Sequence, residues 1–216
     1  MSTKKRTAVK KDQVKVAMAH LKKVDPLMHA AALPYRKELG KKITHRRGYK
    51  RDDLFAALAG SVVGQQLSVK AADTIWERLR VASGGAVTPE AIKKLRVPTM
   101  RKAGLSAAKI KTLKELSNAV LIGNLDLPAL RKVPEEEAIT RLSSIWGIGR
   151  WTAEMFLMFA LDREDVFSSG DLALRRAVET IYNLPKDTPL KTIEAIAASW
   201  TPHRTFASRV LWMTRD

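Results

Sequence analysis

Signals that begin helices recur along this chain, and they limit the fold more than any other feature of the sequence. Asp25-Pro26 and Thr88-Pro89 each place a capping side chain before a proline at the first helical position. The stretch 54–62 repeats apolar residues every four positions, which gives a helix one buried face. No segment alternates apolar and polar residues as a half-buried strand does. The sequence therefore predicts an all-α fold.

The helical segments predict two packed lobes within a single domain. We expect about ten helices joined by short links, with a cleft between the lobes near residues 142–176. Apolar residues make up 45 % of the 216 residues, which is enough for a core. The expected parts are a basic flexible tail (1–12), a central lobe (52–165) and a second lobe (13–51 and 166–216). The second lobe begins with a helix over 14–24, and its basic loop, 35–51, is either a solvated connector or a DNA contact.

The net charge and the cysteine content limit the classes of function that the chain can have. Lys and Arg number 39 against 22 Asp and Glu, so the formal net charge is +17. Such an excess indicates a polyanionic partner, most often nucleic acid, with a merely soluble basic surface as the alternative. The absence of cysteine excludes disulfides, thiolate nucleophiles and iron–sulfur clusters. No apolar run approaches the ~20 residues of a membrane span, and the basic N-terminus lacks the apolar core of a signal peptide.

Two glycines in the segment IWGIGRWTA mark a tight loop between two helices. Gly147 and Gly149 permit backbone angles and a close approach that other residues resist, and Ile148 between them can anchor the loop in the core. The next helix offers N–H groups and its positive dipole end to a phosphate oxygen, and Arg150 and Thr152 could add side-chain donors. The segment is either a helix–hairpin–helix that binds DNA without reading its sequence or an ordinary tight helical turn.

This loop and several other segments together resemble a known family. WGIGRWTA followed by VFSSGDLALRRA is similar to the core of the helix–hairpin–helix DNA glycosylases, in particular the DNA-3-methyladenine glycosylase II branch. Three more similar segments follow the order of the family: SVVGQQLSVKAA (61–72), AGLSAAKIKTL (103–113) and WTPHRTFASRVLWM (200–213). The resemblance extends from about residue 54 to the C-terminus.

The resemblance implies a catalytic role for Asp171, which precedes the expected helix LALRRA. Taken alone, an aspartate at this place is an N-cap. The two roles are compatible, because a helix N-terminus favours a charged carboxylate and holds it in a fixed geometry. In the implied role, Asp171 stabilises the positive charge that develops on the sugar and orients or deprotonates the attacking water.

Further site residues are implied by the same resemblance. The damaged base must leave the stack, and Gln65 and Gln66 are expected to contact DNA, with Gln66 or a neighbour in 64–67 filling the gap. The expected base-pocket residues are Trp151, Met155, Leu172 and Trp212. Buried core tryptophans are the plainer alternative for the two indoles. No catalytic metal or cofactor is implied, but a structural cation could bind the carbonyls of Ser143, Ile145 and Ile148.

Departures from the family pattern shape the expected activity. Relatives with lyase activity place a lysine nucleophile where this chain has Trp151, so a Schiff base at that position is excluded and the enzyme should be monofunctional. Trp146 stands where proline usually precedes the first glycine. Met155 and Leu172 replace two pocket aromatics of some relatives, which leaves the range of lesions open.

We therefore expect a monofunctional DNA glycosylase that flips alkylated purines, of the 3-methyladenine and 7-methylguanine type, and hydrolyses their N-glycosidic bond. The alternatives are a non-catalytic helix–hairpin–helix DNA-binding module and a glycosylase for oxidised or mismatched bases. The expected partner is double-stranded DNA with damaged bases, bound by a monomer without membrane contact. The expected location is the nucleoid of the cytoplasm in a bacterium and the nucleus in a eukaryote.

Overall fold

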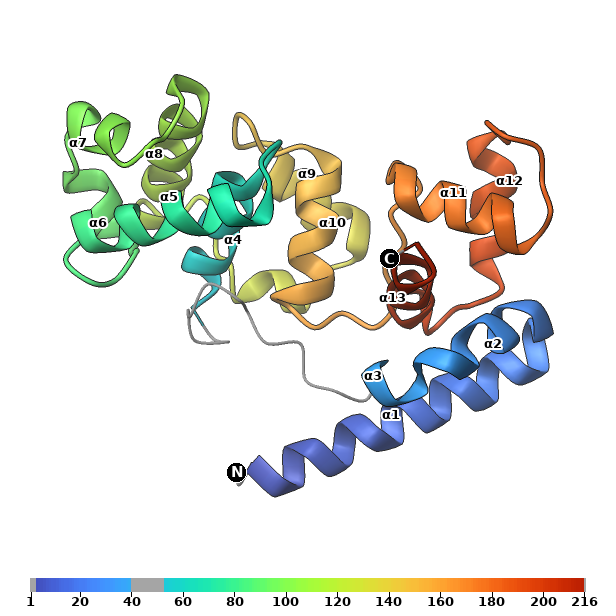
Figure 1. Ribbon diagram of the computed structural model, residues 1–216. Coiled ribbons are helices and arrows are strands. Elements are labelled where there is room, and N and C mark those ends of the chain that lie inside the picture. Colours follow the sequence, from blue (N-terminus) through green and yellow to red (C-terminus); the bar gives the residue numbers. More distant parts are fainter. Residues whose placement is uncertain (1–2, 40–52, 216) are drawn as a thin grey trace. The chain divides into compact units, whose positions relative to one another are not determined.

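The computed structural model describes residues 3–39 and 53–215, with side chains from residue 13 on. Within these ranges the chain forms helices and no strand, which confirms the predicted all-α fold (Figure 1). None of the described helices is both long and apolar enough to cross a membrane. The chain divides into two compact units, one of Met1–Thr44 with Arg163–Asp216 and one of His45–Asp162. We call them unit 1 and unit 2.

Unit 2 is built around a single buried helix. Its elements are α4 (Leu54–Gly64), α5 (Val69–Ala82), α6 (Pro89–Lys94), α7 (Val97–Lys102), α8 (Ala107–Leu121), η2 (Ala129–Arg131), α9 (Glu135–Ser143) and α10 (Arg150–Phe159). Helix α4 packs against α5, α8 and α10. Because it has neighbours on several sides, nearly all its residues are buried, including the predicted core positions Leu54, Leu58 and Val62.

Side-chain caps begin four helices of unit 2, α4, α5, α6 and α8, and the cap of α6 at Thr88 is the one that the sequence predicts. Asp53 Oδ1 accepts the N–H of Ala56 at 3.0 Å, and the hydroxyls of Ser68, Thr88 and Ser106 accept the N–H three residues later in the same way. Each cap satisfies one of the N–H groups that a helix start leaves without an internal acceptor.

Unit 1 brings the two ends of the sequence together. Its elements are α1 (Thr3–Val24), α2 (Pro26–Ala32), η1 (Leu33–Tyr35), α3 (Arg36–Leu39), α11 (Leu172–Ile181), α12 (Leu190–Ala198) and α13 (Arg204–Met213). Helix α2 packs against α1, α11 and α13. The shared core includes Leu21 and Met28 from the first part of the chain and Leu174 and Ala207 from the last. A unit made of distant segments is held by such long-range packing.

Three predictions about helix limits need correction or fall outside the described residues. The prediction of a flexible tail over residues 1–12 is wrong from Thr3 on, because helix α1 begins at Thr3. The helix can extend this far because residues 3–24 include no glycine or proline, which would end it. The basic loop predicted for 35–51 lies outside the described residues from residue 40, and its start is helical in η1 and α3. More than ten helices are described, because η1, α3 and η2 have three or four residues and are too short for a periodic pattern.

A buried carboxylate joins the two halves of unit 1. Asp25 caps α2 through Oδ1, which accepts the N–H of Met28 at 3.0 Å. Its Oδ2 accepts the indole N–H of Trp200 at 2.8 Å and the hydroxyl of Tyr182. Asp25 is only 8 % exposed, so these donors replace the water that the carboxylate loses. Burial, and next the hydrogen bond to Asp25, raise the pKa of Tyr182 far above its usual range, so Tyr182 stays a donor.

Replacing Asp25 with alanine should destabilise the protein strongly. The change removes a helix cap and leaves the buried donors of Trp200 and Tyr182 without their acceptor, so we expect a loss of about 3–5 kcal/mol in the free energy of unfolding. Urea denaturation followed by circular dichroism measures it. Exposed Asp126, which accepts the N–H of Ala129 in a turn before η2, is the matched control, and Asp126→Ala should cost no more than about 1 kcal/mol. Equal losses in the two variants would contradict this account of Asp25.

Candidate functional site

The loop between α9 and α10 forms the tight hairpin that its two glycines predict. Gly147 adopts φ +83°, in the left-handed region that favours glycine, and Gly149 is the N-cap of α10. A Cβ on Gly147 would lie 2.1 Å from Oγ1 of Thr112 on α8. Gly147 is therefore required twice, once for its backbone angle and once for the close approach of α8.

The hairpin is anchored by apolar side chains beneath it. Ile145 and Ile148 are buried, as the sequence predicts for Ile148. The N–H of Ile148 donates to the carbonyl of Ile145 at 3.0 Å, which closes the turn. A carbonyl oxygen has two lone pairs, so the Ile145 oxygen can still join a cation site with Ser143 and Ile148. That site stays a prediction.

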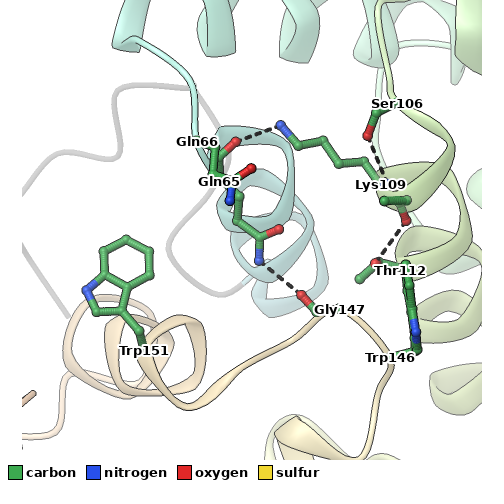
Figure 2. A pocket seen from close by; sticks show the side chains of 9 residues that line it. Gln65, Gln66, Ser106, Lys109, Thr112, Trp146, Gly147 and Trp151 are labelled. Atoms are coloured by element: carbon green, nitrogen blue, oxygen red, sulfur yellow. Dashed lines mark hydrogen bonds between the residues drawn. The ribbon is translucent and has the colours of Figure 1, made fainter. Parts of the chain in front are cut away.

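Gln65 ties the end of α4 to the hairpin. Its Nε2 donates to the carbonyl of Gly147 (Figure 2) and to Oγ1 of Thr152, both at 3.1 Å. Thr152 is 4 % exposed. The interpretation of its side chain as a DNA donor is therefore corrected: the hydroxyl lies inside the protein, where it supports the hairpin. Gln66 is exposed at φ +55°, and it stays the candidate for filling the gap left by a flipped base.

A lysine that the sequence analysis left without a role holds the same junction. Lys109 Nζ donates to the carbonyl of Gln65 (Figure 2) and to that of Val63, both at 2.8 Å. These are carbonyls at the C-terminal end of α4, where the helix dipole is negative and a cation is stabilising. The segment AGLSAAKIKTL places Lys109 near the start of α8, but nothing local indicates that its partner lies 44 to 46 residues away.

Arg150, the first residue of α10, forms ion pairs with two glutamates of unit 2. Its Nη1 donates to Oε2 of Glu136 at 2.8 Å and its Nε to Oε1 of Glu154 at 2.9 Å. The hydrogen bond to Glu136 raises the pKa of Arg150 and lowers that of Glu136, so both stay charged. Arg150 thus links α9 to the first turn of α10. Its partners neutralise much of its charge, and the N-terminus of α10 remains as the positive feature of the hairpin.

A pocket of about 420 Å³ lies beside the hairpin, within unit 2 (Figure 2). It is lined by Gln65, Gln66, Ser106, Ala108, Lys109, Thr112, Trp146, Gly147 and Trp151. Trp151 is 46 % exposed, so it is not a buried core tryptophan. Met155 lies one turn further along α10 and is partly buried. The two predicted pocket residues of α10 therefore share a face of that helix.

Asp171 begins α11 in unit 1 and is held by two donors. Its Oδ1 accepts the N–H of Leu174 at 3.0 Å, which confirms the predicted N-cap. The same oxygen accepts the indole N–H of Trp212, from α13, at 3.4 Å. Asp171 is partly exposed and Leu172 beside it is exposed. The structure thus brings two of the predicted site residues into contact, the Asp171 carboxylate and the Trp212 indole, and Leu172 follows Asp171 directly in the chain.

Comparisons with known proteins show the family of the chain. Residues 59–202 match the family model described as HhH-GPD superfamily base excision DNA repair protein. DNA-3-methyladenine glycosylase 1 of Schizosaccharomyces pombe is 36 % identical over 171 residues, which cover 78 % of this chain and 75 % of that protein.

Two solved structures are similar as well. The 3-methyladenine DNA glycosylase Mag1 of S. pombe, in complex with abasic DNA, is 32 % identical with a TM-score of 0.76, and the match covers 92 % of this chain and 95 % of that one. A DNA-3-methyladenine glycosidase from Bacillus halodurans is 37 % identical with a TM-score of 0.69, over 74 % and 75 % of the two chains.

Gly147→Ala should destabilise the protein by about 2–4 kcal/mol, because the new Cβ is strained at positive φ and overlaps the hydroxyl of Thr112. The double variant Gly147→Ala/Thr112→Ala should recover most of this loss, since the overlap disappears and only the backbone strain of about 1 kcal/mol remains. Gly149→Ala is the control: a Cβ there meets no atom within 4 Å. Thermal unfolding of the four proteins measures these differences. If Gly149→Ala were as destabilising as Gly147→Ala, contact with Thr112 would not be the cause.

Proposed function

This chain belongs to the HhH-GPD superfamily of base excision DNA repair proteins, and on that basis we propose that it is a monofunctional DNA glycosylase. Its substrates are alkylated purines of the 3-methyladenine and 7-methylguanine type in double-stranded DNA, and its product is an abasic site. The observation that carries the proposal is Asp171, a partly exposed carboxylate held by a helix start and by Trp212. The names of the relatives, which are DNA-3-methyladenine glycosylases, support the choice of substrate.

Asp171 supplies the chemistry of bond cleavage in this proposal. As the bond between sugar and base breaks, positive charge develops on the sugar, and a nearby carboxylate stabilises it. The same group can orient or deprotonate the water that attacks the sugar. Two donors to Oδ1 restrict rotation of the carboxylate, which favours a fixed orientation before the substrate binds.

The hairpin supplies DNA binding without sequence preference. The first turn of α10 directs N–H groups and a positive dipole end outwards, and glycine at 149 leaves space for a close phosphate, since no atom lies within 4 Å of its Cβ position. The net charge of +17 adds attraction to the polyanion. Binding should therefore weaken steeply as salt is raised.

The proposed recognition of the base depends on the lesion itself. An alkylated purine carries positive charge, which suits the π-face of an exposed indole such as Trp151. The charge also makes the base a better leaving group, so the protein does not need many hydrogen bonds to select it. Met155, Leu172 and Trp212 are the further residues that we assign to the base.

A lyase activity is not part of the proposal. In the resemblance, the lysine that forms a Schiff base corresponds to Trp151, whose indole cannot act as that nucleophile. Hydrolysis directed by Asp171 then leaves an intact sugar–phosphate backbone. The strand at such a site breaks only under alkali.

Asp171→Asn should abolish release of the base while DNA binding is kept. Asparagine is also a good N-cap, so stability should change little, but its amide cannot stabilise the positive sugar or take a proton. We expect the single-turnover rate on methylated duplex DNA to fall by about 10²-fold or more. Free base released is measured for wild type, Asp171→Asn and the control Asp126→Asn, which changes an exposed aspartate of unit 2.

The other outcomes of this experiment separate the alternative functions. Breaks without alkali would reveal a lyase nucleophile. Full activity of Asp171→Asn would remove Asp171 from catalysis. Tight, salt-sensitive binding with no base released from any lesion would favour a non-catalytic DNA-binding module, and release of oxidised or mismatched bases alone would change the substrate class.

Trp212→Phe should lower the rate of base release by about fivefold to tenfold, because a ring remains but the N–H donor to Asp171 is lost. Affinity for duplex DNA with an abasic analogue should stay within twofold of wild type. In the Asp171→Asn background the same change should have little further effect on the rate. An equal fold-loss in both backgrounds would mean that Trp212 acts through packing and not through the carboxylate.

A further inference from the structure

Trp146 exposes a large indole at the rim of the hairpin. It is 45 % exposed, although its neighbours Ile145 and Ile148 are buried and anchor the loop. A tryptophan normally buries most of its ring, since exposed aromatic surface is costly in water. The core of unit 2 therefore gives no reason for an indole at this position.

Two residues of α8 contact Trp146, one at its backbone and one at its ring. The backbone N–H of Trp146 donates to Oε2 of Glu115 at 3.3 Å. Lys111 Nζ lies 4.2 Å from the centroid of the indole, in a cation–π contact. Lys111 and Glu115 also form an ion pair at 3.9 Å. Trp146 thus contacts α8 on both its backbone and its ring, and the two side chains beside it carry opposite charges.

The position of the ring links it to the surface that meets DNA. Trp146 lines the same pocket as Gly147 and Trp151, and in the view of Figure 2 Gly147 lies between the two indoles. Trp151 follows the second glycine of the hairpin and Trp146 precedes the first. A DNA strand whose phosphate sits at the hairpin would carry an adjacent sugar past one of these rings. The indole ring is uncharged. It therefore suits contact with the apolar face of a deoxyribose better than contact with a charged phosphate.

We propose that Trp146 is a second aromatic DNA contact, which packs on a deoxyribose of the strand held by the hairpin, away from the reacting sugar. The inference rests on the proposed function, because it needs DNA at the hairpin. In this proposal Trp146 contributes to the affinity for DNA and not to catalysis or to the choice of lesion. The contact strengthens binding to damaged and undamaged duplexes alike, since every nucleotide offers the same sugar.

Trp146→Ala and Trp146→Phe test this contact by fluorescence anisotropy with a labelled duplex that contains a tetrahydrofuran abasic analogue, and with the same duplex undamaged. We expect Trp146→Ala to weaken binding to both by about tenfold, from the loss of apolar contact area. Trp146→Phe should recover part of the loss. The salt dependence of binding should keep its slope, because no charge is removed. Ile122→Ala, at the far end of α8 with 57 % exposure, is the control and should change nothing.

Base release separates this inference from the proposed function. Weaker binding by Trp146→Ala with a normal single-turnover rate at saturating enzyme supports the contact. If Trp146→Ala binds both duplexes within twofold of wild type and releases the base normally, the proposed sugar contact is wrong but the proposed function stands. The exposed indole would then serve another partner, such as a protein. A reduced salt slope in Trp146→Ala would also contradict the sugar contact. Failure of the wild type to release any base overturns the proposed function, whatever the result for Trp146.

Discussion

The hairpin of this protein depends on the hydrogen bonds at the C-terminal end of α4. Gln65 donates to the Gly147 carbonyl and the Thr152 hydroxyl, and Lys109 donates to the carbonyls of Val63 and Gln65. Together these contacts connect α4, α8 and the hairpin at one point. Each donor also satisfies a carbonyl or hydroxyl that would otherwise cost free energy when removed from water. The orientation of α10, and so of the proposed phosphate site, follows from this junction.

Three aspartates show how one local geometry can serve different purposes. Asp25, Asp53 and Asp171 each accept the N–H three residues later at 3.0 Å. Asp25 is buried and also accepts from Tyr182 and Trp200, which makes it a link between distant segments. Asp171 stays partly exposed beside one indole, which leaves the carboxylate able to meet a substrate. The difference lies in what the rest of the fold packs around each cap.

Much of the helical architecture could be predicted, and the failures share a cause. Caps such as Asp25 and Thr88 were predicted because their N–H partners lie three residues away. The prediction for Thr152 was wrong because its hydroxyl faces Gln65, which lies 87 residues earlier in the sequence. The role of Lys109 and the Asp25 network were missed for the same reason. Pattern and propensity describe neighbours within about one helical turn, and they hold no information on distant partners.

By itself, the sequence determined the helical class, several helix starts, the glycines of the hairpin and the basic charge, because each follows from interactions between near neighbours or from composition. Only the tertiary structure decided which polar side chains form hydrogen bonds inside the protein and which stay exposed. It placed Trp200 on Asp25, 175 residues apart, and Trp212 on Asp171, 41 residues apart. It also left Trp146 exposed on Lys111. The packing of segments distant in sequence sets these contacts. A buried polar group costs free energy unless it forms a hydrogen bond, so the fold pairs buried donors with buried acceptors.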